Sequence, residues 1–265
     1  MNIRAFFKNI IDSISTTKGL YNAAKKMYWL YNKSARSSNH TTQINFKYPY
    51  PINKISLQVR YNQGADAFIL SEVFQQQCYR LPLNDAITHI LDLGANAGFT
   101  AVYFSKFFPK AKIACVEPMP GNIAILKENL SLNKVNSVVF EAAATIEDGK
   151  ITMEIGDKDY GNKVHNIPFG KSMGNSTLIV DGLSINTILK KLNWKKIALL
   201  KIDIEGYEGI LLGTNNNWLA KTDTIIIEIH EGVTIDFLKK IVAPYGLNYI
   251  MLQKGNWVLS RKEIF

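Results

Sequence analysis

The feature that most constrains the fold is an alternation of short apolar strands and amphipathic helices that begins near residue 88. The pattern predicts strands at 90–93, 112–116, 137–140, 197–202 and 224–229, and helices at 99–108, 123–132, 184–192, 208–212 and 235–242. Apolar strands joined by helices are typical of a doubly wound, mostly parallel sheet. Two last strands, 247–252 and 256–259, predict an antiparallel edge hairpin. The sequence also predicts a strand at 55–59, a helix at 67–78 and a hairpin near 151–155. The expected fold class is therefore α/β, with a ligand at the carboxyl ends of the strands.

The N-terminal segment differs from the rest of the chain in charge. Residues 1–40 contain seven basic residues and one acid, so they hold six of the nine net positive charges. Their apolar residues follow helical spacing and are interrupted by charges, which predicts an amphipathic helix and neither a signal peptide nor a transmembrane span. We expect residues 1–45 to form a basic helical extension and residues 46–265 the main domain.

The sequence allows two alternative contacts for this N-terminal extension. It either packs on the body of the protein or makes a peripheral membrane contact through residues 1–40. We expect no nucleic-acid partner, and the sequence does not indicate an oligomeric state. Cys78 and Cys115 lie in no metal or disulfide pattern, which fits a cytoplasmic location. His40, His89 and His165 have no chemical context and are interpreted as surface or packing residues.

The turn at residues 90–98 (ILDLGANAG) predicts a cofactor site. Its small residues let a ligand approach the backbone, and the following helix offers free N–H groups. A dinucleotide turn has a glycine where Asn96 stands, and the carboxylate of Asp92 repels a pyrophosphate but suits the ammonium of an amino acid. The turn therefore favours S-adenosylmethionine over NAD. The candidate cofactor-binding residues here are Asp92, Gly94, Ala95, Asn96 and Gly98.

The next two strands extend this site. Glu117 ends the second strand, followed by Pro118, and a carboxylate at this place can accept both ribose hydroxyls. The third strand ends in small residues at 141–144, where Ala142 is a candidate neighbour of the adenine.

The fourth and fifth strands end in ionisable residues: Asp203 and Glu205 after the fourth, Glu228 and His230 after the fifth. Charges at the ends of buried strands need partners or a ligand. His230 is the first candidate for a catalytic base, with Asp203 or Glu228 orienting it. A divalent metal held by Asp203 and Glu228 is a second hypothesis. The third is a structural salt-bridge cluster that includes Lys201.

These motifs resemble the FkbM family of S-adenosylmethionine-dependent methyltransferases. The matching segments are 59–66 (VRYNQGAD), 73–74 with 79–80, 92–98, 116–118 (VEP), 126–130, 200–206 (LKIDIEG) with Glu208, and 227–230 (IEIH). The resemblance implies a class I methyltransferase Rossmann-like fold and O-methylation of a sugar, a glycan or a related natural product. It also implies that Asp92, Gly94, Asn96, Gly98 and Glu117 line the cofactor and that Asp203 lies beside the methyl group.

Two residues depart from the family pattern. Ala65 stands where a serine is usual, and Tyr207 stands where a small residue is usual and reshapes the expected pocket. We expect the loop at 157–180 to select the acceptor. The leading hypothesis is an O-methyltransferase. Its alternatives are an NAD-linked oxidoreductase and a catalytically silent binding module with the same fold.

Overall fold

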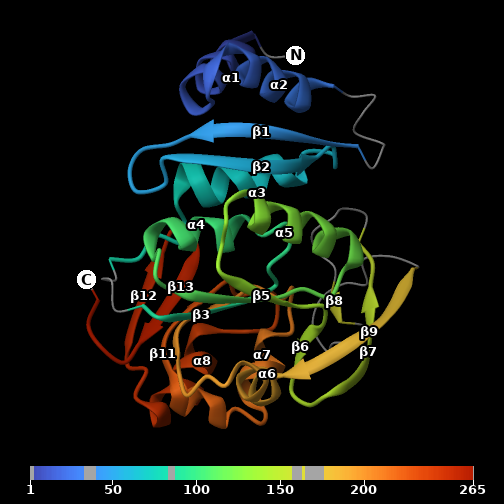
Figure 1. The fold of residues 1–265 in the computed structure, drawn as a ribbon. Helices are drawn as coiled ribbons and strands as arrows, with labels where there is room; N and C mark the ends of the chain where they lie inside the picture. Colours follow the sequence, from blue (N-terminus) through green and yellow to red (C-terminus); the bar gives the residue numbers. More distant parts are fainter. Residues whose placement is uncertain (1–2, 33–39, 83–86, 157–162, 165–175, 265) are drawn as a thin grey trace.

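The computed structural model describes residues 3–32, 40–82, 87–156, 163–164 and 176–264. Figure 1 shows the elements in layers: two N-terminal helices, a hairpin, a layer of helices, the central sheet and a second helical layer. The loop predicted at 157–180 lies largely outside the described residues. Among those described, no helix combines the length and apolar character that crossing a membrane requires.

A seven-stranded sheet in the order β12-β13-β11-β10-β3-β4-β5 forms the centre of the molecule. Its strands are β3 (His89–Leu93), β4 (Lys112–Val116), β5 (Ser137–Phe140), β10 (Ile197–Ile202), β11 (Thr222–Ile227), β12 (Tyr249–Gln253) and β13 (Asn256–Ser260). Pairs from β5 to β11 are parallel, and β13 is antiparallel to β11 and β12. The predicted fold class is confirmed. The strand order reverses between β3 and β10, which is where open sheets bind ligands.

Helices cover both faces of this sheet, which explains why all six residues of β10 are buried. The elements are α4 (Phe99–Phe107) and α5 (Pro120–Leu132) on one face, and α6 (Ile185–Leu192), α7 (Glu208–Gly213) and α8 (Ile235–Val242) on the other (Figure 1). Ser184 and Thr234 cap α6 and α8 by accepting hydrogen bonds from backbone N–H groups in the first turn. Short 3-10 turns, η3 (Asn217–Lys221) and η4 (Ala243–Tyr245), complete the C-terminal half.

A smaller sheet lies beside the central one, with strand order β6-β9-β7-β8. Its strands are β6 (Ala143–Thr145), β7 (Gly149–Glu154), β8 (Lys163–Val164) and β9 (Thr177–Ser184). The sequence analysis predicts a hairpin near 151–155 but not the strand at Thr177–Ser184. This sheet gives the site described below one of its walls.

The N-terminal layer consists of α1 (Ile3–Thr16), α2 (Gly19–Tyr31) and the antiparallel hairpin of β1 (Thr41–Lys47) and β2 (Lys54–Arg60). The sequence analysis predicts a strand at 55–59 but none at 41–47. The expected domain boundary at residue 45 therefore falls within β1, whose pairing with β2 continues on both sides of that residue.

Asn129 of α5 and Asn133, the residue at its C-cap, bind the backbone of β2. Asn129 accepts a hydrogen bond from the N–H of Gln58 at 2.7 Å and donates one to its carbonyl at 3.1 Å. Asn133 makes the same pair of hydrogen bonds with Ser56, at 3.2 and 2.7 Å. The two amides thus take the place of a further strand, and they satisfy backbone groups that an edge strand leaves open.

The hairpin leads into α3 (Ala65–Leu70), which continues as a π-helical turn, η2 (Ser71–Gln76). One helix is expected over 67–78 from the sequence, so the change of winding is not foreseen. π-helical turns inside helices are frequent at functional sites. Here the turn brings Glu72 and Val73 to the wall of a cavity.

Candidate active site

A cavity lies at the carboxyl ends of β3, β4, β10 and β11, where the strand order reverses. The turn after β3 forms its floor, α3 and η2 form one wall, and Met153 and Val164 of the smaller sheet form another. Nine of the residues predicted from the sequence line this cavity: Gly94, Ala95, Asn96, Glu117, Pro118, Asp203, Glu205, Glu228 and His230. Asp92, Gly98 and Ala142 are buried and do not contribute to its lining.

The glycines of the turn are required by packing inside the protein. Gly94 has a φ of +75°, and a Cβ there would lie 1.8 Å from the carbonyl oxygen of Asp203. Gly98 has a φ of +80°, and a Cβ there would lie 2.6 Å from Cδ1 of Leu126. The sequence argument rests on ligand approach, whereas the structure adds a backbone clash at Gly94 and a positive φ at both positions as reasons for glycine.

Asn96 stands at the centre of the turn with a φ of +46°, a conformation that asparagine tolerates better than most residues. Its N–H donates to Oε2 of Glu117 at 2.9 Å. Oε1 of Glu117 accepts hydrogen bonds from the N–H of Met119 and from Nδ2 of Asn122, both at 3.0 Å. Burial raises the pKa of Glu117, and these hydrogen bonds oppose that shift. The carboxylate is therefore fixed at the cavity wall.

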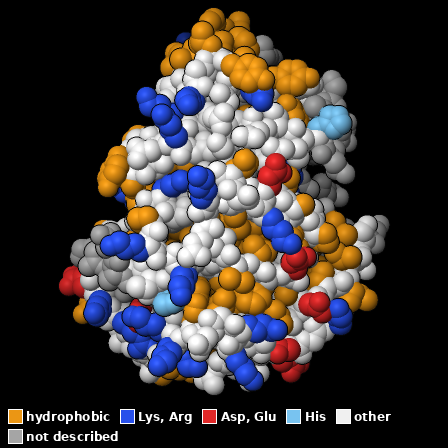
Figure 2. Space-filling model, in the orientation of Figure 1, with side chains coloured by type: hydrophobic (Ala, Val, Ile, Leu, Met, Phe, Trp, Pro, Cys, Tyr) orange, Lys and Arg blue, Asp and Glu red, His pale blue; other side chains and the backbone are white. Residues whose placement is uncertain are grey.

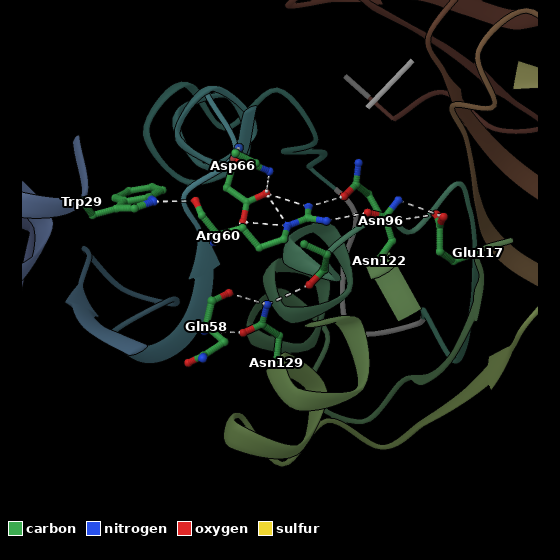
Figure 3. Close-up of polar contacts among 10 residues, drawn as sticks. Trp29, Gln58, Arg60, Asp66, Asn96, Glu117, Asn122 and Asn129 are labelled. Atoms are coloured by element: carbon green, nitrogen blue, oxygen red, sulfur yellow. Dashed lines mark hydrogen bonds and ion pairs between the residues drawn. The ribbon is translucent and has the colours of Figure 1, made fainter. Parts of the chain in front are cut away.

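Arg60 connects the hairpin to this turn (Figure 3). Its guanidinium pairs with Asp66 at 2.7 Å and donates to Oδ1 of Asn122 at 2.6 Å and to Oδ1 of Asn96 at 3.0 Å. Trp29 of α2 donates to the carbonyl of Arg60 at 2.7 Å. The sequence analysis assigns Arg60 and Asp66 no role. The position of Arg60 at the end of an apolar strand could have indicated a buried ion pair, because a buried charge needs a partner.

Lys201 occupies the base of the cavity with 1% of its surface exposed. Its Nζ donates to the carbonyl of Gly94 at 2.7 Å and lies 3.2 Å from Asp92 and 3.3 Å from Asp203. Burial alone lowers the pKa of this lysine, but the two carboxylates outweigh it and hold the pKa above its usual value. Burial also raises the pKa of Asp92, which Lys201 opposes. Lys201 thus stands between Asp92 and the cavity. The sequence analysis names it only as a member of a structural salt-bridge cluster, whereas it contacts both the cofactor turn and Asp203.

A tight turn after β10 presents Asp203 and Glu205. Glu205 and Gly206 have φ values of +56° and +99°. The fully buried carboxylate of Glu208 accepts hydrogen bonds from the N–H of Ile204 at 3.0 Å and from that of Gly206 at 3.0 Å. Glu208 therefore holds the backbone in a conformation that is costly for a residue with a Cβ.

The same carboxylate orients His230. Nδ1 of His230 lies 2.9 Å from Oε1 of Glu208, and Nε2 lies 3.5 Å from Oε2 of Glu205. Burial lowers the pKa of His230, but Glu208, Glu205 and Asp203 together raise it to about 9. Because Glu208 is an acceptor, the neutral ring keeps its proton on Nδ1 and turns the lone pair of Nε2 outward. The imidazole is thus a base that is mostly protonated at neutral pH.

Two further carboxyl groups face the cavity. Burial, followed by Asp203, raises the pKa of Glu228. Burial, Glu228 and Asp203 together raise the pKa of Glu72 to about 7. Glu72 was missed from the sequence because only the π-helical turn directs this position to the site. Tyr207, the departure noted above, is 7% exposed and also lines the cavity.

The metal hypothesis names Asp203 and Glu228. Ligand atoms of Asp203, Glu205 and His230 lie within 4.8 Å of one another, and Glu228 does not belong to this group. Lys201 and the imidazolium of His230 supply positive charge to the same carboxylates. Because Glu228 lies outside this group, the two residues named for the metal are not brought together as ligands, and we derive no step through a metal.

Comparison with known proteins adds independent evidence. The family model described as "Methyltransferase FkbM domain" matches residues 92–246. Methyltransferase 1 of Beauveria bassiana (strain ARSEF 2860) is 25% identical over 180 residues, covering 61% of this chain and 72% of that protein. Hexuronic acid methyltransferase AglP of Haloferax volcanii is 27% identical over 176 residues, covering 66% and 70%.

Among solved structures, M. jannaschii TYW2 in complex with AdoMet aligns with a TM-score of 0.43 and 13% identity, covering 84% of this chain and 85% of that one. The match to the family model is the decisive comparison, because it spans more than half of the 265 residues and includes the turn at Gly94, Glu117, Asp203 and His230. The chain belongs to the FkbM family of methyltransferases.

Proposed function

We propose that the protein transfers a methyl group from S-adenosylmethionine to a hydroxyl of a sugar, a glycan or a related natural product. The observation that carries this proposal is the position of His230 and its carboxylates beside the turn at residues 94–98, in one cavity. An NAD-linked oxidoreductase is not supported, because the family is one of methyltransferases. The carbohydrate acceptor is favoured by the similarity to a hexuronic acid methyltransferase.

The residues present fit the cofactor. Glu117 offers a buried carboxylate at the cavity wall for the ribose hydroxyls, and Gly94 and Ala95 line the same cavity. Asp92 does not line the cavity: its Oδ1 lies 3.2 Å from Nζ of Lys201, so this carboxylate acts on the site through the lysine. When bound, S-adenosylmethionine supplies a methyl group on a positively charged sulfur.

The side chains around the cavity prepare the acceptor. A hydroxyl must lose its proton as it attacks, and Nε2 of His230 is placed to receive that proton. Glu208 fixes the ring and stabilises the imidazolium that forms, at 2.9 Å. Asp203 and Glu228 can orient the acceptor by accepting hydrogen bonds from neighbouring hydroxyls. Positioning and proton removal are thus provided by residues of the chain itself.

The charge of the cavity bears on the class of acceptor. Its described lining contains five carboxyl groups and two cationic side chains, Lys201 and His230. The carboxyl groups are those of Glu72, Glu117, Asp203, Glu205 and Glu228. The pKa is raised at three of these groups, yet a carboxyl group hydrogen-bonds to neutral hydroxyls in either protonation state, whereas each ionised one repels an anionic acceptor. We therefore propose a neutral sugar as the acceptor.

The experiment combines binding and turnover. Calorimetric titration should show binding of S-adenosylmethionine and S-adenosylhomocysteine, and methyl transfer should be faster to neutral aryl glycosides than to the matched uronosides. Loss of both cofactor titrations would overturn the assignment as a methyltransferase. Binding without transfer to either set of glycosides would favour the silent module, and faster transfer to uronosides would overturn the neutral acceptor alone.

The pH profile tests the base. Because the pKa of His230 is raised to about 9, kcat should increase with pH and level off near that value. The His230→Gln variant should bind the cofactor normally and lose roughly two orders of magnitude in kcat together with this pH dependence. A profile that levels off near pH 7 and persists in His230→Gln would overturn His230 as the base and favour Glu72.

A further inference from the structure

Helix α1 exposes its apolar side to solvent. Ile3, Phe7, Ile11 and Ile14 are 70%, 59%, 68% and 54% exposed. At 100° per residue these four positions fall within an arc of about 80°, so they form one continuous stripe along the helix. A stripe of this kind normally packs against the core.

The opposite side of α1 packs against the protein. Ser13 is 0% exposed, and Lys26 of α2 donates to Asp12 at 2.6 Å and to Thr16 at 2.8 Å. The ring of Phe6 contacts that of Tyr31 of α2, with centroids 5.5 Å apart. The helix is therefore attached through hydrogen bonds, an ion pair and one aromatic contact on this side. This orientation leaves the apolar stripe without a partner among the described residues.

Helix α2 enlarges this apolar surface. Leu20, Tyr21 and Tyr28 are 76%, 72% and 62% exposed. Figure 2 shows hydrophobic side chains gathered at the top of the molecule, over the layer that Figure 1 assigns to α1 and α2, with basic side chains close by. Contiguous apolar patches on soluble proteins mark sites of interaction with proteins or membranes.

The charges around the stripe indicate which occupant fits. Arg4, Lys8 and Lys18 are exposed, whereas Asp12 is paired with the buried Lys26. Arg4 and Lys8 border the stripe on one side, at about 100° and 140° on the helical wheel that starts at Ile3. Large apolar residues next to basic ones, with tyrosines at the margin, match the boundary between anionic headgroups and acyl chains.

We propose that α1 and α2 dock on an anionic lipid bilayer. The stripe at Ile3, Phe7, Ile11 and Ile14 enters the headgroup boundary, and Arg4, Lys8 and Lys18 contact lipid phosphates. The contact is peripheral, because it uses one face of the helix. It is independent of the proposed methyl transfer, since none of these residues lines the active-site cavity.

The test is co-sedimentation of the full chain with vesicles of phosphatidylcholine, with and without phosphatidylglycerol. The wild type should pellet with the anionic vesicles, and about 0.5 M salt should weaken this binding. Ile11→Ser/Ile14→Ser should lower the partition coefficient at least about tenfold. Lys8→Glu/Lys18→Glu should lower it at least about tenfold for anionic vesicles and remove most of its salt dependence.

A matched control comes from two aliphatic residues elsewhere. Ile179 and Leu252 are 68% and 55% exposed, nearly the same as Ile11 and Ile14. Ile179→Ser/Leu252→Ser should bind vesicles like the wild type. Circular dichroism and thermal melting should show that all variants are folded. Equal losses in the control and test pairs would overturn the proposal, as would wild-type protein that stays in the supernatant.

A second copy of the chain is the competing occupant. Light scattering after size exclusion distinguishes it: a dimer that Ile11→Ser/Ile14→Ser dissociates, combined with no vesicle binding, would assign the stripe to self-association and overturn the membrane contact. A monomer that binds anionic vesicles supports it.

Discussion

At the scale of the residue, Arg60 illustrates how the cofactor site depends on side chains that do not touch the cavity. Its planar guanidinium meets Asp66, Asn122 and Asn96 at once, in directions that a lysine cannot reproduce. Asn122 in turn donates to Glu117. Arg60 is therefore a positioning residue for the turn and for the carboxylate proposed to hold the ribose.

The Arg60→Lys variant should bind S-adenosylhomocysteine roughly tenfold more weakly, because hydrogen bonds from the cation to the two asparagines are lost. Isothermal titration measures this change. Arg80→Lys, at an exposed arginine whose side chain contacts Gln77, is the control and should bind normally. Because a structural role alone would lower the melting temperature without changing affinity, both quantities should be measured. Unchanged affinity in Arg60→Lys would contradict the positioning role.

Gly94 is the residue of the turn that lies closest to another part of the backbone, that of Asp203. Gly94→Ala should lower the free energy of unfolding by about 2–4 kcal/mol, because a Cβ would meet the backbone of Asp203 at 1.8 Å and force β3 and β10 apart. Gly19→Ala is a matched control. Its φ is +78°, close to the +75° of Gly94, but a Cβ there meets no heavy atom within 4 Å. Chemical denaturation of both variants separates the clash from the conformational cost. Equal losses would contradict the clash.

At the scale of the element, α5 joins the hairpin to the cofactor turn. Besides binding Gln58, Nδ2 of Asn129 donates to the carbonyl of Ala97 at 2.8 Å. Asn133 makes the equivalent contacts with Ser56 but does not reach the turn. The two asparagines therefore differ in their third contact, because Asn133 donates to the carbonyl of Asn129 at 2.8 Å and Asn129 to that of Ala97.

Asn129→Asp should destabilise the fold by about 2–4 kcal/mol and weaken cofactor binding, because a carboxylate cannot donate and would face the carbonyls of Gln58 and Ala97. Asn133→Asp makes the same chemical change at β2 and should destabilise the fold while preserving cofactor affinity. Urea unfolding and calorimetric titration of the two variants give the comparison. Similar affinities in both variants would show that the hydrogen bond to Ala97 is unimportant.

The elements that could be predicted are those with a strong apolar period. From residue 88 onward the expected strands and helices agree with the structure to within a few residues, for example at β10 (Ile197–Ile202) and α8 (Ile235–Val242). β1 was missed although its threonines, Ile44 and Phe46 suit a strand, because the polar residues before it were interpreted as a linker that extends to residue 42. The strand-end acids were found from their positions along the chain. Glu72, Arg60 and the central place of Lys201 depend on contacts between distant segments, which spacing does not encode.

At the scale of the whole molecule, the carboxyl groups of the active site lower the stability of the fold when they ionise. Five carboxyl groups share one cavity, and the pKa values of Glu72, Glu117 and Glu228 are all raised, chiefly by burial. Ionising a group whose pKa is raised in the folded state favours unfolding. A bound sulfonium cation would offset this repulsion, so the cofactor should raise the melting temperature more at alkaline than at acidic pH.

The ion pairs of His230 stabilise the fold within a defined range of pH. Its pKa is 6.5 in the reference state and about 9 in the folded protein. Its ion pairs therefore contribute stability that is complete below pH 6.5 and is lost as the pH rises through about 9. The melting temperature of the wild type should exceed that of His230→Gln at pH 6, and the gap should close by about pH 10. Differential scanning calorimetry across this range tests the sign. A gap that widens with pH would contradict it.

The pairing of α5 with β2 has a consequence for insertions in this chain. Four residues of helix rise about 6 Å and two residues of strand about 6.8 Å, so the spacing of Asn129 and Asn133 matches that of alternate residues of β2. These contacts fix the register of β2 against α5 independently of the length of the turn at 48–53. Residues added to that turn leave Arg60 in place, whereas one residue added between Gln58 and Arg60 reverses the side of the strand on which the guanidinium lies.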